Sequence, residues 1–426
     1  MTAESTVDST VGSGVGHGSG SRSRRTLVGE RIGVLDGLRG VAIILVFLSH
    51  HYYLWSPVTD DTNPVVATLL DSGNLAVSIF FAVGAFLYTR SLVRRRDRAD
   101  LGINPPVVVA RRYVRLTAQV AVLLLAVAAV TVLDGGDTYP GTDLGRSAVH
   151  VLTHSWNWFV LDEVALARPD LGHLWYVSVD FQVFLAVLLL VHVLRRHATT
   201  LVVVLLLLLV ACWAWRHHVF VEEGQFYALL RTTTRADAAL AGAAVGAATA
   251  TGWLEHVRPH ARAVVVVSVL ALVPLAWVTL DESWHFGWGG VALDLTLMAL
   301  LAGVAVAPSV PVAVARTVGA RPLAFLGRRS LGVYVWHFPV FNQVSAHGAD
   351  WESWQRVAVA WPLALLLAAA SEYFVEGQVR HLLAAGWWSR VDLPRDDTRR
   401  VDPVDFSAVW DAAGQPSTSP AARSRR

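Results

Sequence analysis

Apolar residues recur along the chain in blocks of about 20 residues separated by short polar stretches, which is the length that the hydrocarbon core of a bilayer requires. Ten such blocks can be placed if a few polar positions are accepted inside several of them. Their predicted bounds are 33–55, 73–90, 113–133, 173–194, 199–219, 226–250, 261–280, 286–307, 322–346 and 355–376. The pattern predicts an all-α fold, a polytopic membrane helix bundle of about ten transmembrane helices.

The charges of the connecting segments alternate along the chain. Loops that follow even-numbered spans carry Arg, and loops that follow odd-numbered spans carry Asp and Glu. By the positive-inside rule this alternation predicts that both termini are cytoplasmic. The expected location is the cell (plasma) membrane, as a multi-pass protein.

The two ends of the chain differ from the apolar middle. Residues 1–30 are rich in Ser, Gly and Thr, and residues 392–426 are rich in Arg, Asp, Pro and Ser, so both are expected to be disordered cytoplasmic tails. The transmembrane domain is expected over 31–391, with no further domain after it. The longest outer loop, 134–172, contains an amphipathic piece, His150–Phe159, that is expected to lie along the outer interface with Trp156 and Trp158 in an aromatic belt.

Composition excludes several classes of protein. The 426 residues are 54% hydrophobic and 16% charged, whereas a soluble domain usually carries about 25% charged residues. A lone Cys212 can form neither an intramolecular disulfide nor a cysteine-based metal cluster. We expect no metal site, no tightly bound cofactor and no nucleic-acid partner, and the lipid bilayer is the first expected partner.

Charged residues inside spans are costly, so each one is a candidate functional residue. In the first span Arg39 and His50 are 11 residues apart, which places them on one helix face about 16 Å apart along the axis. Asp36 lies three residues before Arg39 on the same face and is expected to hold its guanidinium. His51 points about 100° away, which favours His50 as the reactive histidine.

Further polar residues lie in the later spans. Arg111 and Arg115 share a face at the start of the third span, and paired guanidinium groups suit phosphate oxygens. Arg112 beside them is expected to be a cytoplasmic anchor. The remaining candidates for a polar network are His173, Asp180, Arg235, Asp237, Tyr334, His337 and Glu376.

The residues alone leave two functions open. An Arg-lined cytoplasmic mouth with a buried histidine suits an anionic, phosphate-bearing ligand, and it also suits a proton-coupled carrier. For Arg231, Arg235 and Asp237, structural ion pairing with one another or with Asp180 is at least as compatible with the sequence as catalysis.

The chain resembles the acyltransferase-3 family of bacterial membrane O-acyltransferases over residues 31–380. The matching pieces occur in order along the spans: Leu35–Gly40 with His50, Ser78–Leu87, Arg111–Leu116, His173–Trp175 with Asp180, Arg235–Ala238 with Gly242, Leu326–Pro339, and Glu376. The chain departs from the family pattern at Asp180, where a glutamate is customary, and at Leu116-Thr117, where a proline is usual.

The resemblance implies an enzyme that moves an acyl group, usually acetyl, from acyl-CoA to a hydroxyl of a sugar, a cell-envelope glycan or a secondary metabolite. It implies that His50 is the catalytic histidine with Arg39 as its functional partner, and that Arg111 and Arg115 bind the phosphates of the donor. Acyl-CoA is then a co-substrate and the hydroxyl-bearing acceptor a further partner. The alternative is a proton-coupled membrane transporter or flippase that uses Asp180, Arg235 and His50 as a relay.

Overall fold

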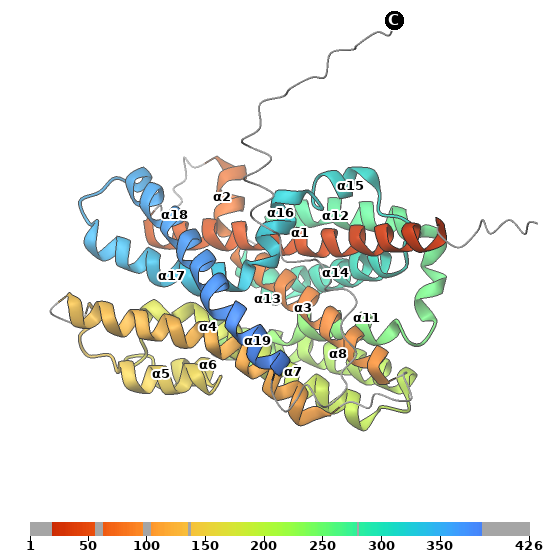
Figure 1. Cartoon of the computed structure of the whole chain (residues 1–426), viewed down its shortest axis with the longest axis horizontal. Helices are drawn as coiled ribbons and strands as arrows, with labels where there is room; N and C mark the ends of the chain where they lie inside the picture. The colour runs from red at the N-terminus through yellow and green to blue at the C-terminus, as the bar shows by residue number, and fades with distance from the viewer. Residues whose placement is uncertain (1–18, 56–62, 97–103, 135–137, 279–280, 386–426) are drawn as a thin grey trace, which may run out of the picture.

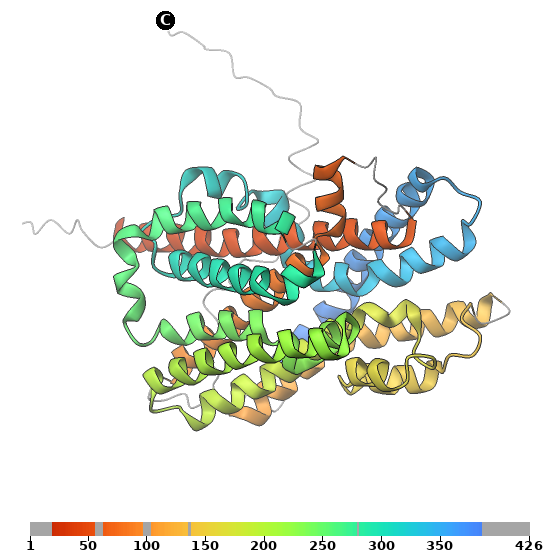
Figure 2. The same ribbon diagram turned by 180° about the vertical axis from the view of Figure 1, so that it is seen from behind.

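In a computed structural model, the protein is described over residues 19–55, 63–96, 104–134, 138–278 and 281–385. Helices and their connections make up these ranges, and no strand occurs in them. The nine longest helices are α1 (Ser19–Trp55), α3 (Gly73–Arg96), α4 (Pro105–Leu133), α7 (Trp175–Val193), α8 (Ala198–Glu223), α12 (Ala261–Val278), α14 (Trp288–Val306), α17 (Ser330–His347) and α18 (Ser353–Ser371). In Figure 1 and Figure 2, α1, α12 and α14 run through one layer of the bundle, and α4, α7 and α8 form the other layer.

Short helices connect the long ones. The α-helices among them are α2 (Pro64–Asp71), α5 (Leu144–Leu152), α6 (Trp156–Asp162), α9 (Gln225–Leu230), α10 (Thr232–Arg235), α11 (Asp237–Ala248), α13 (Glu282–Phe286), α15 (Val312–Arg316), α16 (Arg321–Arg328) and α19 (Gly377–Ala385). Three 3₁₀ turns, η1 (Pro169–Leu174), η2 (Trp253–His256) and η3 (Arg258–His260), and a π-helical turn, η4 (Glu372–Glu376), complete the described segments.

Eight helical segments of the described chain are long and apolar enough to cross a membrane. They are Gly33–Trp55, Gly73–Arg94, Pro105–Leu133, Pro169–Val193, Ala198–Glu223, Arg258–Trp277, Trp288–Val306 and Ser353–Leu383. Each coincides with one predicted span, which confirms the all-helical, multi-pass fold class. The total of ten spans and the cytoplasmic side of the termini stay predictions.

The two other predicted spans are helical but interrupted. The span predicted at 226–250 divides into α9, α10 and α11, with breaks at Arg231 and Ala236. The span predicted at 322–346 divides into α16 and α17 at Arg329. Both spans were predicted as single helices from their continuous apolar length. Charged residues lie at or beside each break, and their contacts with other helices accompany the change in backbone direction.

Breaks within a membrane bundle leave backbone groups that the protein itself must satisfy. At the break between α9 and α10, the Asn157 side-chain amide donates to the Leu230 carbonyl oxygen at 3.0 Å. At the break between α5 and α6, the Gln182 amide donates to the His154 carbonyl oxygen at 2.7 Å and to Asn157 Oδ1 at 2.9 Å. The two breaks are therefore stabilised by the same pair of side chains.

The segment that holds α5 and α6 packs into the protein beside α4 (Figure 1). The Tyr113 hydroxyl on α4 donates to the Leu152 carbonyl oxygen at 3.1 Å. Trp156 is 0% exposed and Phe159 is 3% exposed. The expectation that Trp156 belongs to an interfacial aromatic belt is therefore wrong, because neighbouring helices bury this face of the amphipathic piece.

The predicted domain bounds, 31–391, stay a prediction. Helix α1 begins at Ser19, whereas the predicted domain begins at residue 31. Residues 1–18 and 386–426 lie outside the described part of the chain, so the predicted tail at 392–426 and the first part of the predicted N-terminal tail stay predictions.

Glycines bring several helices into backbone contact. A Cβ atom at Gly37 would lie 1.7 Å from the Val318 carbonyl oxygen, and a Cβ atom at Gly40 would lie 2.1 Å from that of Leu323. A Cβ atom at Gly242 on α11 would lie 2.0 Å from the Ala82 carbonyl oxygen on α3. Small residues at such contacts are the usual means of close helix packing in membranes. Here they hold α1 against α16 and α11 against α3.

The contact at Gly242 gives a direct test of this packing. We expect Gly242→Ala to destabilise the protein by about 1–3 kcal/mol, because the added methyl group must push two backbones apart. Gly377→Ala is the matched control, since nothing lies within 4 Å of a Cβ atom there. Thermal unfolding of the detergent-solubilised chain, followed by tryptophan fluorescence, measures both. Equal melting temperatures for the two variants would contradict the close packing of α11 on α3.

Candidate active site

The predicted polar face of α1 packs against α16 and α17. Arg39 Nη2 donates to the hydroxyl of Ser330, the first residue of α17, at 3.0 Å. Arg328 at the end of α16 places a guanidinium nitrogen 3.6 Å from the Asp36 carboxylate. The structure thus places Asp36 beside Arg328, and a bond between Asp36 and Arg39 stays a prediction.

Farther along α1, His50 meets His337 of α17. His50 Nδ1 lies 3.0 Å from the Val46 carbonyl oxygen and 3.1 Å from His337 Nε2. The other ring nitrogen of His337, Nδ1, lies 2.6 Å from the Tyr334 carbonyl oxygen. His337 is 0% exposed, and its ring stacks on Phe47 with ring centroids 5.2 Å apart. The sequence predicted both histidines as candidates, and the fold brings their rings into contact.

His173 of η1 lies in the same region, where it hydrogen-bonds to a carbonyl group that a proline leaves without a donor. Pro339 has no N–H, so the carbonyl of Val335 one turn earlier in α17 lacks its helical donor. His173 Nε2 donates to that carbonyl oxygen at 3.2 Å, and the Tyr334 hydroxyl donates to the carbonyl oxygen of His173. These two bonds fix η1 on α17 and place the ring of His173 5.3 Å from that of His337, measured between centroids.

Asp180 on α7 pairs with Arg112, one of the three arginines near the start of α4. Arg112 Nη2 lies 2.5 Å from an Asp180 oxygen. The guanidinium also lies over the ring of Phe184, 4.5 Å from its centroid, and over that of Tyr88 at 5.0 Å. Arg112 is therefore part of the interior network, where the sequence had suggested only a cytoplasmic anchor, because α7 presents a carboxylate to it.

His154 is a member of this region that the sequence analysis did not single out. It joins α5 to α6 with a φ of 54°, the one positive φ among non-glycine residues of the described chain. Its ring stacks on Phe181 with centroids 4.4 Å apart, and Nε2 lies 3.2 Å from the Thr117 hydroxyl oxygen. Burial lowers the pKa of His154 to about 4, so the ring is neutral near neutral pH. The signal that could have identified His154 in the sequence is its position at a break between two apolar segments.

Arg115 on α4 and Arg329, the residue before α17, form ion pairs with carboxylates. Arg115 Nη2 lies 3.0 Å from Glu376 Oε1, and Arg329 Nε lies 2.6 Å from a Glu372 oxygen. Both glutamates lie in the π-helical turn η4, a rare conformation that is often found at functional sites. The sequence predicted a phosphate-binding fork of Arg111 and Arg115. The structure gives Arg115 a carboxylate partner, and the fork itself stays a prediction.

A family described as an acyltransferase domain matches residues 32–373 of this chain, which is most of its length. The chain belongs to the acyltransferase-3 family. The resemblance found in the sequence is thereby confirmed, and the matched range contains the contact of His50 with His337.

Two relatives of Staphylococcus aureus support the same membership. A candidate O-acetyltransferase of Staphylococcus aureus strain MRSA252 is 24% identical over 375 residues, which cover 83% of this chain and 58% of the relative. The O-acetyltransferase OatA of Staphylococcus aureus strain NCTC 8325 is 24% identical over 367 residues, 81% of this chain and 57% of the relative. The chain therefore spans somewhat more than half the length of these relatives. No solved structure matches it.

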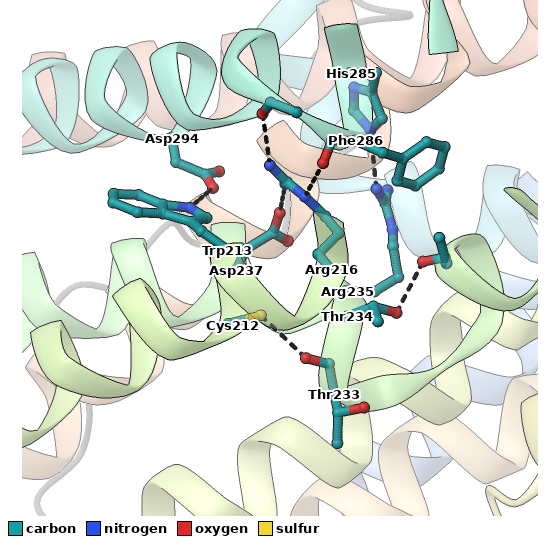
Figure 3. A network of polar contacts seen from close by, with 12 residues as sticks. Cys212, Trp213, Arg216, Thr233, Thr234, Arg235, Asp237, His285, Phe286 and Asp294 are labelled. Carbon is teal, nitrogen blue, oxygen red and sulfur yellow. Dashed lines mark hydrogen bonds and ion pairs between the residues drawn. The ribbon is translucent and has the colours of Figure 1, made fainter. Parts of the chain in front are cut away.

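In this acyltransferase-3 protein, Arg235 and Asp237 belong to a second buried cluster (Figure 3). Asp237 forms an ion pair with Arg216 of α8, and Arg216 also donates to the carbonyl oxygens of Phe286 and Gly287. Arg235 Nη1 lies 3.0 Å from His285 Nε2. The three residues Arg216, Arg235 and Asp237 are each at most 3% exposed. The cluster ties α8, α10 and α11 to α13 and to Gly287, the residue before α14.

This cluster also touches the histidine region through an aromatic ring. The Arg235 guanidinium lies over the ring of Trp175, 5.6 Å from its centroid, and Trp175 begins α7 directly after η1. Among the described residues, Asp180 forms its ion pair with Arg112 and not with Arg235. The sequence analysis did not name Arg216 or Asp294, whose carboxylate accepts a hydrogen bond from Trp213 Nε1 at 2.8 Å. Both residues lie inside predicted spans, so intramembrane charge was the signal that could have identified them.

Loss of Arg216 tests the buried cluster. We expect Arg216→Met to destabilise the protein by about 3–5 kcal/mol, because Asp237 is left as a buried charge without its cation. The double variant Arg216→Met/Asp237→Leu should recover part of that loss. Arg258→Met is the control, since Arg258 pairs with Glu255 at the surface, where both side chains are about 60% exposed. Thermal unfolding in detergent measures all three, and equal effects of Arg216→Met and Arg258→Met would show that the pair is not structural.

Proposed function

We propose that this chain is a membrane O-acetyltransferase that moves an acetyl group from acyl-CoA to a hydroxyl of a carbohydrate acceptor, with His50 as the general base. Membership of the family and the names of the Staphylococcus aureus relatives support the reaction class. The observation that carries the proposal is the placement of His50 in an apolar bundle with Nδ1 directed at a carbonyl oxygen.

In our proposal this placement assigns the reacting nitrogen of His50. A carbonyl oxygen only accepts hydrogen bonds, so Nδ1 of His50 must carry the proton that points to the Val46 oxygen. In the neutral imidazole Nε2 then holds the lone pair. Nε2 is the atom that can take a proton from an acceptor hydroxyl.

The reaction follows from this assignment. His50 Nε2 takes the proton of the acceptor hydroxyl while its oxygen attacks the thioester carbonyl carbon of the donor. The resulting tetrahedral intermediate collapses, the carbon–sulfur bond breaks, and the coenzyme A sulfur leaves. The proton held on Nε2 passes to that sulfur, so the products are an acetyl ester and free coenzyme A, and His50 is neutral again.

The arginines are arranged to hold the donor along the path to His50. Arg39 and His50 lie on the same face of α1 about 16 Å apart along the axis, so Arg39 meets a part of the donor remote from the reacting carbonyl. Arg115 and Arg329 lie in ion pairs with carboxylates of η4. In our proposal the phosphates of acyl-CoA replace these carboxylates, because phosphate oxygens suit a guanidinium fork.

The structure also bears on the group that stabilises the oxyanion. Tyr334 has a single hydroxyl proton and gives it to the His173 carbonyl oxygen. The Tyr334 hydroxyl therefore has no further proton to donate to an oxyanion in this arrangement. Arg39 lies about 16 Å from His50 along the axis of α1, so it does not reach the oxyanion that forms at the carbonyl beside His50.

The acceptor in our proposal is a hydroxyl of a cell-envelope carbohydrate, and the protein resides in the plasma membrane. The relatives named as O-acetyltransferases support a hydroxyl as the accepting group. The apolar helices support a bilayer as the surroundings. A transporter that uses Asp180, Arg235 and His50 as one relay gains less support, because Asp180 and Arg235 have separate partners in Arg112 and His285.

Turnover of acetyl-CoA by the purified full chain in nanodiscs tests the proposal, with release of the coenzyme A thiol and labelling of sugar acceptors as readouts. We expect His50→Gln to lower kcat by about 10²–10⁴-fold, since the general base is lost. Arg115→Ala should raise KM for acetyl-CoA by about tenfold with kcat nearly unchanged, because it removes a binding contact remote from the reacting bond.

His51→Gln is the matched control, since His51 is the next residue on α1 and its ring packs on Trp55. Wild-type turnover in the His51 variant, together with loss in the His50 variant, supports the assignment. Acyl transfer at the wild-type rate by a correctly inserted His50→Gln variant would refute it. Flux of an unmodified substrate into liposomes without acyl-CoA turnover would favour the transporter.

A further inference from the structure

His337 has a hydrogen-bond arrangement that leaves one assignment of protons. Its Nδ1 faces the Tyr334 carbonyl oxygen at 2.6 Å, and a carbonyl oxygen accepts only, so the proton of the neutral ring lies on Nδ1. Nε2 of His337 therefore holds a lone pair. The group 3.1 Å from that lone pair is Nδ1 of His50.

The lone pair on His337 Nε2 and the Val46 carbonyl oxygen require the same tautomer of His50. A lone pair on His337 Nε2 is satisfied only if His50 Nδ1 carries a proton. The Val46 carbonyl oxygen, at 3.0 Å from His50 Nδ1, requires it independently. The two acceptors belong to different helices, α1 and α17, and they agree in leaving the lone pair of His50 on Nε2.

We propose that His337 is a positioning residue that holds His50 in the Nδ1–H tautomer and stabilises the imidazolium that forms during acyl transfer. The inference rests on the proposed function and deepens it. When His50 Nε2 takes the proton of the acceptor hydroxyl, its Nδ1–H still donates to His337 Nε2 and to Val46. His337 neither gains nor loses a proton in the cycle.

The surroundings of His337 keep its ring in place. The ring is fully buried, stacks on Phe47, and meets the edge of Phe341 with centroids 5.8 Å apart. His173 is near, but its Nε2 donates to the Val335 carbonyl oxygen and so does not compete for His337 Nε2. His50 is thus the partner that the geometry gives to this lone pair.

A neutral histidine in this role has a physical reason. A carboxylate would hold the imidazolium more strongly, but a carboxylate buried in an apolar bundle carries a large desolvation cost while His50 is neutral. An imidazole acceptor has no charge in the resting state, and it still offers a lone pair at the moment when His50 becomes positive. The arrangement suits a base that is charged only during the reaction.

The test compares His337→Phe with His337→Gln in the full chain in nanodiscs. Phe keeps the ring that stacks on Phe47 and removes the acceptor, whereas Gln keeps an amide oxygen that accepts a hydrogen bond. We expect His337→Phe to lower kcat by about 10²-fold with KM for acetyl-CoA changed by less than about twofold. His337→Gln should recover at least about tenfold of that loss.

The second readout reports the tautomer directly. ¹⁵N NMR of histidine-labelled protein, with the His50→Gln spectrum subtracted to identify the His50 signals, should show Nδ1 protonated and Nε2 unprotonated in the wild type. In His337→Phe we expect a second population with the reverse assignment. This spectrum needs no turnover, so it decides the tautomer even if the wild type transfers no acyl group and the proposed function fails.

Two results would overturn the inference. One is a folded His337→Phe variant with wild-type kcat. The other is an equal loss of kcat in His337→Phe and His337→Gln together with an unchanged His50 spectrum, which would assign His337 to packing alone. Thermal unfolding of both variants, compared with the wild type, separates these results from a failure to fold.

Discussion

A buried polar group in this bundle has to find its partner inside the protein, because the apolar surroundings offer none. That constraint governs the structure at its most irregular points. The carbonyl of Val335, which Pro339 leaves without a helical donor, takes the Nε2–H of His173. The carbonyl of Leu230, at the break between α9 and α10, takes the amide of Asn157. In each case the unpaired carbonyl oxygen accepts a hydrogen bond from a side chain that is distant in the sequence.

Close packing at glycine determines where the candidate base lies. Gly37 and Gly40 let the backbone of α1 rest on the segment that contains Val318 and Leu323, immediately before α17. With α1 held there, Arg39 meets Ser330 at the start of α17, and His50 meets His337 about three turns later along α1 and about two turns later along α17. Eleven residues separate Arg39 from His50 on α1, and seven separate their partners Ser330 and His337 on α17.

The charged residues separate into two groups with different uses. Arg216, Asp237 and Arg235 are almost fully buried and join α8, α10 and α11 to α13. Arg115 and Arg329 keep part of their surface accessible and pair with carboxylates of a single π-helical turn. A ligand with phosphate groups can compete for the second group, whereas the first has no accessible surface to offer it. The chain belongs to the acyltransferase-3 family, and in our proposal the partly exposed arginines are the ones that bind the acyl donor.

The sequence by itself determined the helical membrane class, the position of eight spans, and the identity of the costly polar residues, because apolar length and intramembrane charge are local properties of the chain. It also carried the family resemblance. The sequence could not determine which charged residues pair with one another. In the structure the pairs are Asp180 with Arg112, Asp237 with Arg216, and Asp36 with Arg328. Nor could the sequence place His154 or break the spans at Arg231 and Arg329, because these depend on contacts between segments far apart in the chain. Tertiary structure alone decided that His50 meets His337, since that contact exists only once α1 and α17 are packed together.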